Sequence, residues 1–235
     1  MAADRIQAHA EPEPASERGR ATRDRLLDAA ERIFAERGFE GTSIRAVTHA
    51  AGASVSAANY HFGSKEALLH ATLMRHIEPI NRRRVERLTV LEREAGEAPL
   101  PLEAILDAFL RPAFEVRAES PDAPARYRQM AARIFSDPPE VVANLRRDLF
   151  EGVTRRFIEA LHRALPDQSP EQLQLSFHFM VGVFVHVIAG HLDIMRDAAG
   201  AAELSDAAIL QRLITFASAG LRAPVGESAS AGEGA

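Results

Sequence analysis

Apolar side chains recur at helical spacing along most of the 235-residue chain, and no stretch alternates in the way a β-strand does. The pattern predicts a first helix from Arg23 to Arg37. Its apolar stripe comprises Leu26, Leu27, Ala30, Ile33 and Phe34. Thr22 is placed to cap the start of this helix, and Gly38 is placed to end it in the left-handed conformation.

Two short helices are predicted next, in the segment GTSIRAVTHAAGASVSAANYHFG at 41–63. Ser43 or Thr42 can cap the first of them, and Ser54 can cap the second. Gly52 lies between the two helices at a position that suits a tight turn. Two short helices joined in this way are the sequence form of a helix-turn-helix.

A long fourth helix is predicted to follow Ser64, and Pro79 should kink it by removing one backbone hydrogen bond. Further helices are predicted at 102–118, 124–136, 139–164, 170–197 and 205–221. The fold class is therefore all-α, with an N-terminal three-helix helix-turn-helix domain joined through the long fourth helix to a larger helical domain. The expected boundaries are a disordered arm at 1–20, the helix-turn-helix domain at 21–68, the larger domain at 69–222 and a disordered tail at 223–235.

Composition excludes several classes of protein. There is no cysteine, so neither a disulfide framework nor thiol chemistry is available. The longest apolar run, at 179–190, is too short to cross a membrane, and the N-terminus has no apolar leader. We therefore expect a cytoplasmic protein with no membrane association. No nucleophile with its base, phosphate-binding glycine loop or metal set is visible, so we expect neither an enzyme nor a cofactor.

Charge is divided unevenly along the chain. The net charge is −5, but residues 16–90 hold 13 basic and 9 acidic side chains, which gives +4 there and −9 elsewhere. Among 28 basic residues the one lysine is Lys65, in the first turn of the fourth helix, where its charge opposes the helix dipole. A phosphate held there by Lys65 and Ser64 would account for it. The alternative is a surface lysine loosely paired with Glu66.

The segment TRDRLLDAAERIFAERGFEGTSIRAVTHAAGASVSAANYHFGSKEALL at 22–69 resembles the DNA-binding domain of the TetR family of bacterial transcriptional regulators. The resemblance covers about 50 continuous residues, including the glycines, the caps and the apolar positions. It implies that the larger domain is a ligand-binding and dimerisation domain, which resembles its family counterpart in helix length and order.

The resemblance also implies roles for residues around the second and third helices. Base edges in the major groove would be read by Ser56, Ala57 and Asn59, and Arg45 would contact guanine or backbone. Phosphates would be held by Thr42 or Ser43, Ser54, Tyr60, His61 and Lys65. Many relatives carry glycine and tyrosine where this chain has Ser56 and Asn59, so the assignment of base-reading residues is open. For Asn59 the alternative is a local backbone hydrogen bond, and for Tyr60 it is packing against the first helix.

In the larger domain, the family binds a small ligand in a cavity between helices. The candidate lining residues are Phe109, Phe114, Met130, Phe135, Phe150, Phe157, Phe177, Met180, Phe184 and His178. For each apolar residue the alternative is an ordinary place in the core. His178 and His186 are the polar groups expected to point inward, and their spacing without a nearby carboxylate does not suit a metal.

The segments NYHFGSK, HFMVGV and FASAGLRAP resemble a fatty-acid-responsive branch of the family, which implies a fatty acid or acyl-coenzyme A as the ligand. Other lipophiles would also suit a phenylalanine-rich cavity. The helices at 170–197 and 205–221 are expected to pair with their copies in a homodimer, whose symmetry would match a palindromic operator on double-stranded DNA. The face expected on the last helix is Ile209, Leu213, Phe216, Ala217 and Gly220.

The sequence thus predicts a homodimeric repressor that a lipophilic effector releases from its operator, with Pro79 as a pivot. One alternative is a ligand-independent DNA binder or an activator with the same fold. Another is a helical lipid-binding protein or enzyme that keeps a vestigial helix-turn-helix.

Overall fold

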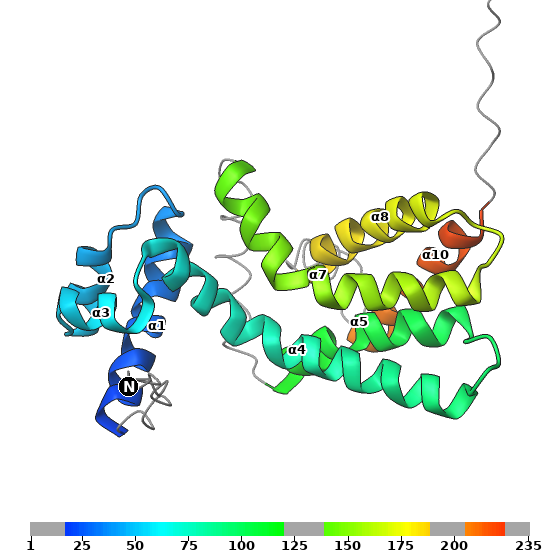
Figure 1. Cartoon of the computed structure of the whole chain (residues 1–235), viewed down its shortest axis with the longest axis horizontal. Helices are drawn as coiled ribbons and strands as arrows, with labels where there is room; N and C mark the ends of the chain where they lie inside the picture. Colours follow the sequence, from blue (N-terminus) through cyan, green and yellow to red (C-terminus); the bar gives the residue numbers. More distant parts are fainter. Residues whose placement is uncertain (1–16, 120–138, 189–204, 224–235) are drawn as a thin grey trace, which may run out of the picture.

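The computed structural model describes residues 17–119, 139–188 and 205–223 (Figure 1). This part of the chain holds eight helices and no strand. They are α1 (Glu17–Arg37), α2 (Ile44–Ala51), α3 (Val55–Phe62), α4 (Lys65–Ala95), α5 (Leu102–Glu119), α7 (Pro139–Ala164), α8 (Pro170–Ile188) and α10 (Asp206–Arg222). The predicted all-α fold is confirmed. The helix predicted at 124–136 lies outside the described residues.

We call α1, α2, α3 and the first turns of α4 the head. The predicted stripe of α1 is buried throughout and packs against α2, α3 and α4. Gly38 and Gly52 adopt φ values of 70° and 59°, which other residues rarely reach, so each allows a turn directly after its helix. Ser43, Ser54 and Ser64 cap α2, α3 and α4 as predicted.

The structure corrects the predicted start of α1. This helix begins at Glu17, six residues before Arg23, so residues 17–20 are helical and do not belong to a disordered arm. Thr22 lies inside the helix and its hydroxyl donates to the Arg18 carbonyl at 2.9 Å, so Thr22 is not the cap. The apolar stripe starts only at Leu26, and the pattern therefore carried no signal for the earlier turns.

Helix α4 links the head to the rest of the protein, which we call the body and which comprises the remainder of α4 with α5, α7, α8 and α10 (Figure 1). Its 31 residues correspond to a length of about 46 Å. Leu68 and Leu69 are buried in the head, and Leu88 is buried in the body. The helix continues through Pro79.

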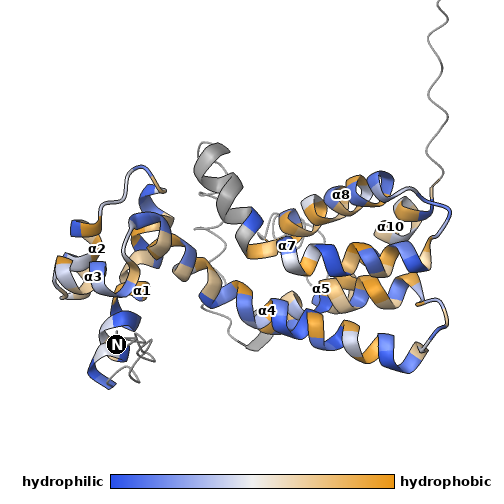
Figure 2. Ribbon diagram, viewed as in Figure 1, coloured by the Kyte–Doolittle hydropathy of each residue, from blue (hydrophilic) through white to orange (hydrophobic). Residues whose placement is uncertain are grey.

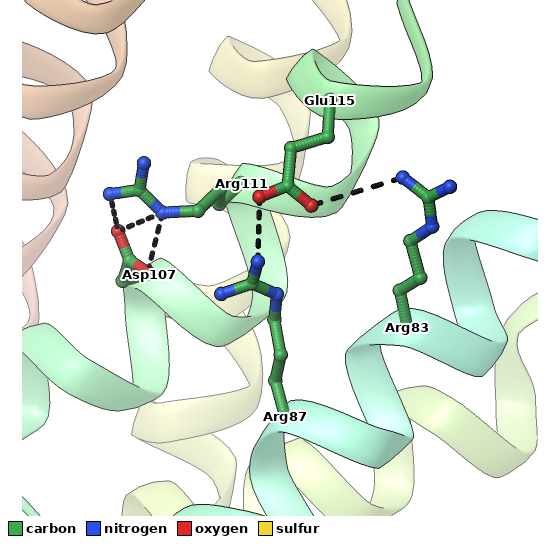
Figure 3. Close-up of polar contacts among 5 residues, drawn as sticks. All are labelled: Arg83, Arg87, Asp107, Arg111 and Glu115. Atoms are coloured by element: carbon green, nitrogen blue, oxygen red, sulfur yellow. Dashed lines mark hydrogen bonds and ion pairs between the residues drawn. The ribbon is translucent and has the colours of Figure 1, made fainter. Parts of the chain in front are cut away.

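The body is a bundle with one apolar core contributed by α4, α5, α7, α8 and α10. Figure 2 shows that the body helices carry both hydrophobic and hydrophilic positions, as amphipathic helices do. The seam between α4 and α5 is also polar at its surface (Figure 3). There Arg87 donates to Glu115 at 2.6 Å, and Arg111 pairs with Asp107 on its own helix.

Helix α7 belongs to both parts of the molecule. Leu149 is buried in the apolar core of the head, whereas Phe157 and Leu161 are buried in the core of the body. Phe150, predicted to line a ligand cavity, packs partly buried against the head instead. A second helix besides α4 therefore joins the two cores.

Candidate nucleic-acid interface

Helix α3 presents a polar face outward from the head. Its one buried side chain is Ala58, which anchors the helix to the core. Ser56 and Asn59 are exposed, Ala57 is half-buried, and Tyr60 is 86% exposed. The alternative that Tyr60 packs against the first helix is therefore wrong. An exposed row of hydroxyl and amide groups on a short helix can reach base edges in a major groove.

Helix α2 supplies a second set of exposed polar groups. Ser43 is exposed and its Oγ accepts a hydrogen bond from the Ala46 N–H at 3.2 Å, as an N-cap does. Arg45 is exposed in the first turn of α2. Val47 and Ala51 are buried and fix the other side of the helix against the core. Ser54 caps α3 in the same way and is also exposed.

Thr42 differs from its neighbour Ser43. Its side chain is 3% exposed, and its hydroxyl donates to the Gly38 carbonyl at 2.7 Å. A buried hydroxyl that is already bonded inside the head is not available to a phosphate. The expectation that Thr42 contacts DNA through its side chain is therefore corrected, and Ser43 is the exposed member of the pair.

Lys65 is held within the head. Its ammonium donates to the Phe39 carbonyl at 3.1 Å and lies 4.0 Å from the centroid of the Phe39 ring. The lysine therefore ties the start of α4 to the segment between α1 and α2. This differs from both expectations, a phosphate clamp or a loose pair with Glu66. An ammonium has three N–H donors, so the contact with Phe39 leaves a role at a phosphate compatible with the geometry.

The start of α4 already carries an anion of its own. Hydrogen bonds from its own backbone N–H and, to a lesser extent, from the Ser64 hydroxyl lower the pKa of the Glu66 carboxyl below its ordinary value. This carboxylate lies at the positive end of the helix dipole, where a negative charge is favourable. A phosphate approaching this helix end would therefore meet Glu66 as well as Lys65.

His61 is half-buried at the end of α3, with its ring 5.2 Å from that of Tyr60 in an edge-on arrangement. Arg23 of α1 also lies at this helix end, 5.6 Å from the centroid of the Phe62 ring. The last turn of α3 thus combines aromatic surface with a cation. Sequence reasoning did not place Arg23 here, because α1 was expected only to begin at that residue.

Two polar contacts join α1 to α4 within the head. His76 lies 3.0 Å from the Glu31 carboxylate, and both side chains are largely buried. Arg75 pairs with Asp28 one turn earlier on α1, and this hydrogen bond raises the pKa of the Arg75 guanidinium. Both contacts join α1 to α4.

Within the body, the structure brings several predicted ligand residues together. The Phe109 ring lies edge-on to Phe157, Phe177 and Phe184, at centroid distances of 5.1, 4.9 and 6.2 Å. Phe114 contacts Phe184, and Met180 is buried in the same core. These residues form one apolar cluster over three helices. Met130 and Phe135 lie outside the described residues.

His178 and His186 were expected to point into this cluster, and both are exposed on α8 instead. The prediction fails because α8 buries Leu173, Phe177, Met180, Phe184 and Val187, and the histidines fall on the opposite side of the helix. Apolar side chains share that outer side. They are Leu175, Phe179, Val183 and Val185.

The last helix divides in a similar way. Ile209, Leu213 and Ala217 are buried in the body's own core, so they do not belong to the outer face that was expected of them. Phe216 is 64% exposed and Gly220 is exposed, which leaves these two on the outside. Helices α8 and α10 contact each other. Both helices also carry exposed apolar side chains.

Sequence reasoning missed the buried arginine of α4. Arg84 is 3% exposed, its guanidinium lies 3.9 Å from the Phe109 centroid, and its Nε donates to the Phe109 carbonyl at 2.8 Å. Its Nη1 donates to Asn81, whose Nδ2 in turn donates to the Leu149 carbonyl of α7. Its position could have been found from helical spacing. Position 84 lies seven residues after Ile77 and four before Leu88, and both of these are buried on the same side of α4.

In the described ranges, no helix is long and apolar enough to cross a membrane. No cluster of three or more histidine, cysteine, aspartate or glutamate residues suited to a metal ion occurs in those ranges either.

Comparison with known proteins gives matches for both parts of the chain. A model for bacterial regulatory proteins of the tetR family matches residues 26–72, and a model for the tetracyclin repressor-like C-terminal domain matches residues 107–220. The transcriptional regulator UidR of Escherichia coli is 36% identical over 75 residues, which are 32% of this chain and only 34% of UidR. The transcriptional repressor KstR2 of Rhodococcus jostii is 28% identical over 67% of this chain and 74% of its own.

Solved structures agree on the fold. A tetR-family regulator from Shewanella sp. PV-4 superimposes with a TM-score of 0.57 at 16% identity, over 85% of this chain and 95% of that one. The fatty acid degradation regulator FadR from Bacillus halodurans gives 0.54 at 15% identity, over 88% and 96%. Together with the outward face of α3, the two family models lead to one conclusion: the chain belongs to the TetR family of bacterial transcriptional regulators.

Proposed function

We propose that this protein is a homodimeric repressor that binds a palindromic operator through α2 and α3 and is released by a lipophilic effector bound in the body. The observation that carries the proposal is the outward face of α3, where Tyr60 and Asn59 are exposed while Ala58 holds the helix in place. Polar groups aimed at solvent from a firmly packed short helix are suited to a groove of DNA.

On DNA, Ser56, Ala57 and Asn59 would read base edges. Asparagine can bond adenine through two hydrogen bonds, and small side chains can pack against a thymine methyl. Ser43, Ser54, Tyr60 and His61 would hold phosphates, as would Lys65 with its remaining donors. Arg45 would reach guanine or backbone from α2.

The homodimer would form through the outer faces of α8 and α10. Phe179 is 66% exposed and Phe216 is 64% exposed, which is unusual for phenylalanine unless another surface covers it. Gly182 is exposed between Phe179 and His186 on α8, and its lack of a side chain favours close approach of a second helix. A two-fold dimer would place two copies of α3 about 34 Å apart, one turn of DNA.

The effector would enter the phenylalanine cluster of α5, α7 and α8. The rings of Phe109, Phe157 and Phe177 contact one another, so an effector must displace part of this packing. An acyl chain is narrow and flexible enough to do so, and a fatty acid or acyl-coenzyme A is the ligand class we favour. The resemblance of three sequence segments to a fatty-acid-responsive branch supports this choice.

The polar chain through Arg84 and Asn81 offers a route from effector to DNA. It joins the Phe109 carbonyl on α5 to the Leu149 carbonyl on α7, and Leu149 packs in the core of the head. A displacement of Phe109 would therefore move α4 and α7 together. The pairs His76–Glu31 and Arg75–Asp28 would pass the shift to α1.

The test is a titration of operator DNA with the purified protein, at several concentrations of long-chain acyl-coenzyme A and free fatty acid. We expect bound effector to weaken DNA binding, and operator DNA to weaken effector binding by the same factor, because the two equilibria are linked. Light scattering of the same samples should give the mass of two chains. DNA affinity that stays constant at saturating effector would contradict the release mechanism, and a monomer on DNA would contradict the dimer.

A further inference from the structure

The first turns of α1 form an overhang that the core of the head does not require. Helix α1 begins at Glu17, yet its first buried side chain is Leu26. Residues 17–25, which we call the overhang, therefore extend the helix by about two and a half turns without an apolar face. Helical structure of this kind gains little from packing, so its side chains can serve another purpose.

The overhang is rich in arginine. It carries Arg18, Arg20, Arg23 and Arg25, all exposed, against the acidic Glu17 and Asp24. The segment thus has a net charge of +2 in a chain whose total is −5. Arginine binds phosphate oxygens through two parallel N–H donors. Helical spacing places Arg20 and Arg23 on one side of the overhang and Arg18 and Arg25 on the other, so phosphates can be bound from either side.

The overhang contacts the end of α3 through Arg23. Arg23 lies over the ring of Phe62, the last residue of α3, at 5.6 Å from its centroid. From that contact, Arg20 and Arg18 lie about 4.5 and 7.5 Å further along the helix axis. Figure 1 shows these first turns of α1 projecting beyond the packed part of the head, next to α3. A cationic extension therefore adjoins the helix that would lie in the major groove.

We propose that the overhang binds phosphates of DNA outside the bases that face α3, so that Arg18 and Arg20 lengthen the footprint of each head along the duplex. The proposal rests on the proposed function of α3. Phosphates are the partner that fits, because the guanidinium groups of the overhang extend beyond α3, the helix that would face the bases. Contacts of this kind add affinity and salt dependence without adding sequence specificity.

The test compares two duplexes that carry the same operator, one ending at the palindrome and one with about ten extra base pairs on each side, about one helical turn. The variant is Arg18→Gln/Arg20→Gln. A control, Arg93→Gln/Arg155→Gln, removes the same charge from exposed positions of the body. A second control, Arg18→Lys/Arg20→Lys, keeps the charge. Helical content is checked by circular dichroism.

On the longer duplex, we expect the glutamine variant to bind more weakly than the wild type, with a log–log salt slope smaller by about 0.9 for each phosphate that it no longer binds. On the short duplex the two proteins should bind alike. The body control should match the wild type on both duplexes, and the lysine variant should keep most of the slope. Equal affinity of wild type and glutamine variant on the longer duplex would overturn the overhang proposal alone. A wild type that selects neither duplex over random DNA would overturn the proposed function as well.

Discussion

The ammonium of Lys65 donates to the carbonyl of Phe39 and lies over the ring of the same residue. One side chain thus fastens the first turn of α4 to the segment between α1 and α2. The contact gives the Lys65 charge a partner at a helix end where that charge is otherwise unfavourable. Arg84 makes the same pair of contacts, to the carbonyl and the ring of Phe109, within the body.

Replacement of Lys65 by methionine should therefore destabilise the head. The variant keeps an apolar stem but loses the hydrogen bond and the cation–π interaction, and we expect it to lower the free energy of unfolding by about 1–2 kcal/mol. Urea unfolding followed by circular dichroism measures this. If Lys65 also binds a phosphate, the salt slope of DNA binding falls by about 0.9 per subunit. Unfolding identical to the wild type would contradict the structural role.

Thr42 and Ser43 are neighbours for which we predict different effects on DNA binding. Thr42→Val keeps the shape of a buried side chain but removes its hydrogen bond to Gly38, so it should cost about 1 kcal/mol of stability and leave the salt slope of DNA binding unchanged. Ser43→Ala should lower both the stability of the fold and the affinity for DNA, because Ser43 caps α2 and its side chain is exposed. Parallel unfolding and binding curves for the two variants separate the roles. A smaller salt slope for Thr42→Val would contradict the conclusion that the Thr42 side chain does not contact DNA.

Much of the head could be predicted from its sequence, because the information is local. Caps such as Ser43 and Ser54, the glycine at 52 and the stripe of α1 each determine structure within a few residues. The contact between Lys65 and Phe39 joins residues 26 apart in the chain, and no local pattern specifies it. The early start of α1 was missed for another reason, since its first turns have no apolar face to detect.

In the body, periodicity identified the helices that the described residues form, but it assigned some side chains to the wrong surroundings. His178 and His186 lie in a segment that is apolar nearly all round, so no polar side marks the direction of solvent. Ile209 and Leu213 were expected to face outward, and they are buried. The sequence could not decide this, because an apolar stripe suits the core of its own domain and the surface of a second subunit equally well. Arg84 was not expected in the core, although its spacing from Leu88 matches the buried row.

The buried chain through Arg84 should behave as a unit. Its guanidinium bonds both Asn81 and the Phe109 carbonyl, and hydrogen bonds to charged groups contribute about 1.5–3 kcal/mol each. We expect Arg84→Met to lower the free energy of unfolding by about 2 kcal/mol. Combined with Asn81→Leu, the loss of stability should be smaller than the sum of the two single losses, by about 1 kcal/mol. Additive losses in a double-mutant cycle would show that the two residues act separately.

The ion pair between Arg222 and Glu103 gives a pH-dependent prediction. Arg222 of α10 bonds the Glu103 carboxylate of α5, and this interaction lowers the pKa of Glu103 to about 2. A carboxylate with a lowered pKa stabilises the fold above its ordinary pKa, and the contribution disappears as pH falls through the folded value. The thermal stability gap between wild type and Glu103→Gln should therefore be constant near neutral pH and narrow from about pH 4.5 towards 2. Since the pair is half exposed, the gap should also shrink with added salt. A gap that widens on acidification would contradict this assignment.

The most direct test of the central claim is selection of bound fragments from genomic DNA by the purified protein, with wild type and Asn59→Ala/Tyr60→Ala side by side. Both side chains are exposed, so the variant should unfold as the wild type does. We predict that the wild type recovers a palindromic site with half-sites one helical turn apart, and that the variant recovers it weakly or not at all. Equal recovery of the same site by both proteins would contradict a recognition role for α3. Failure of the wild type to enrich any sequence would contradict the proposed function.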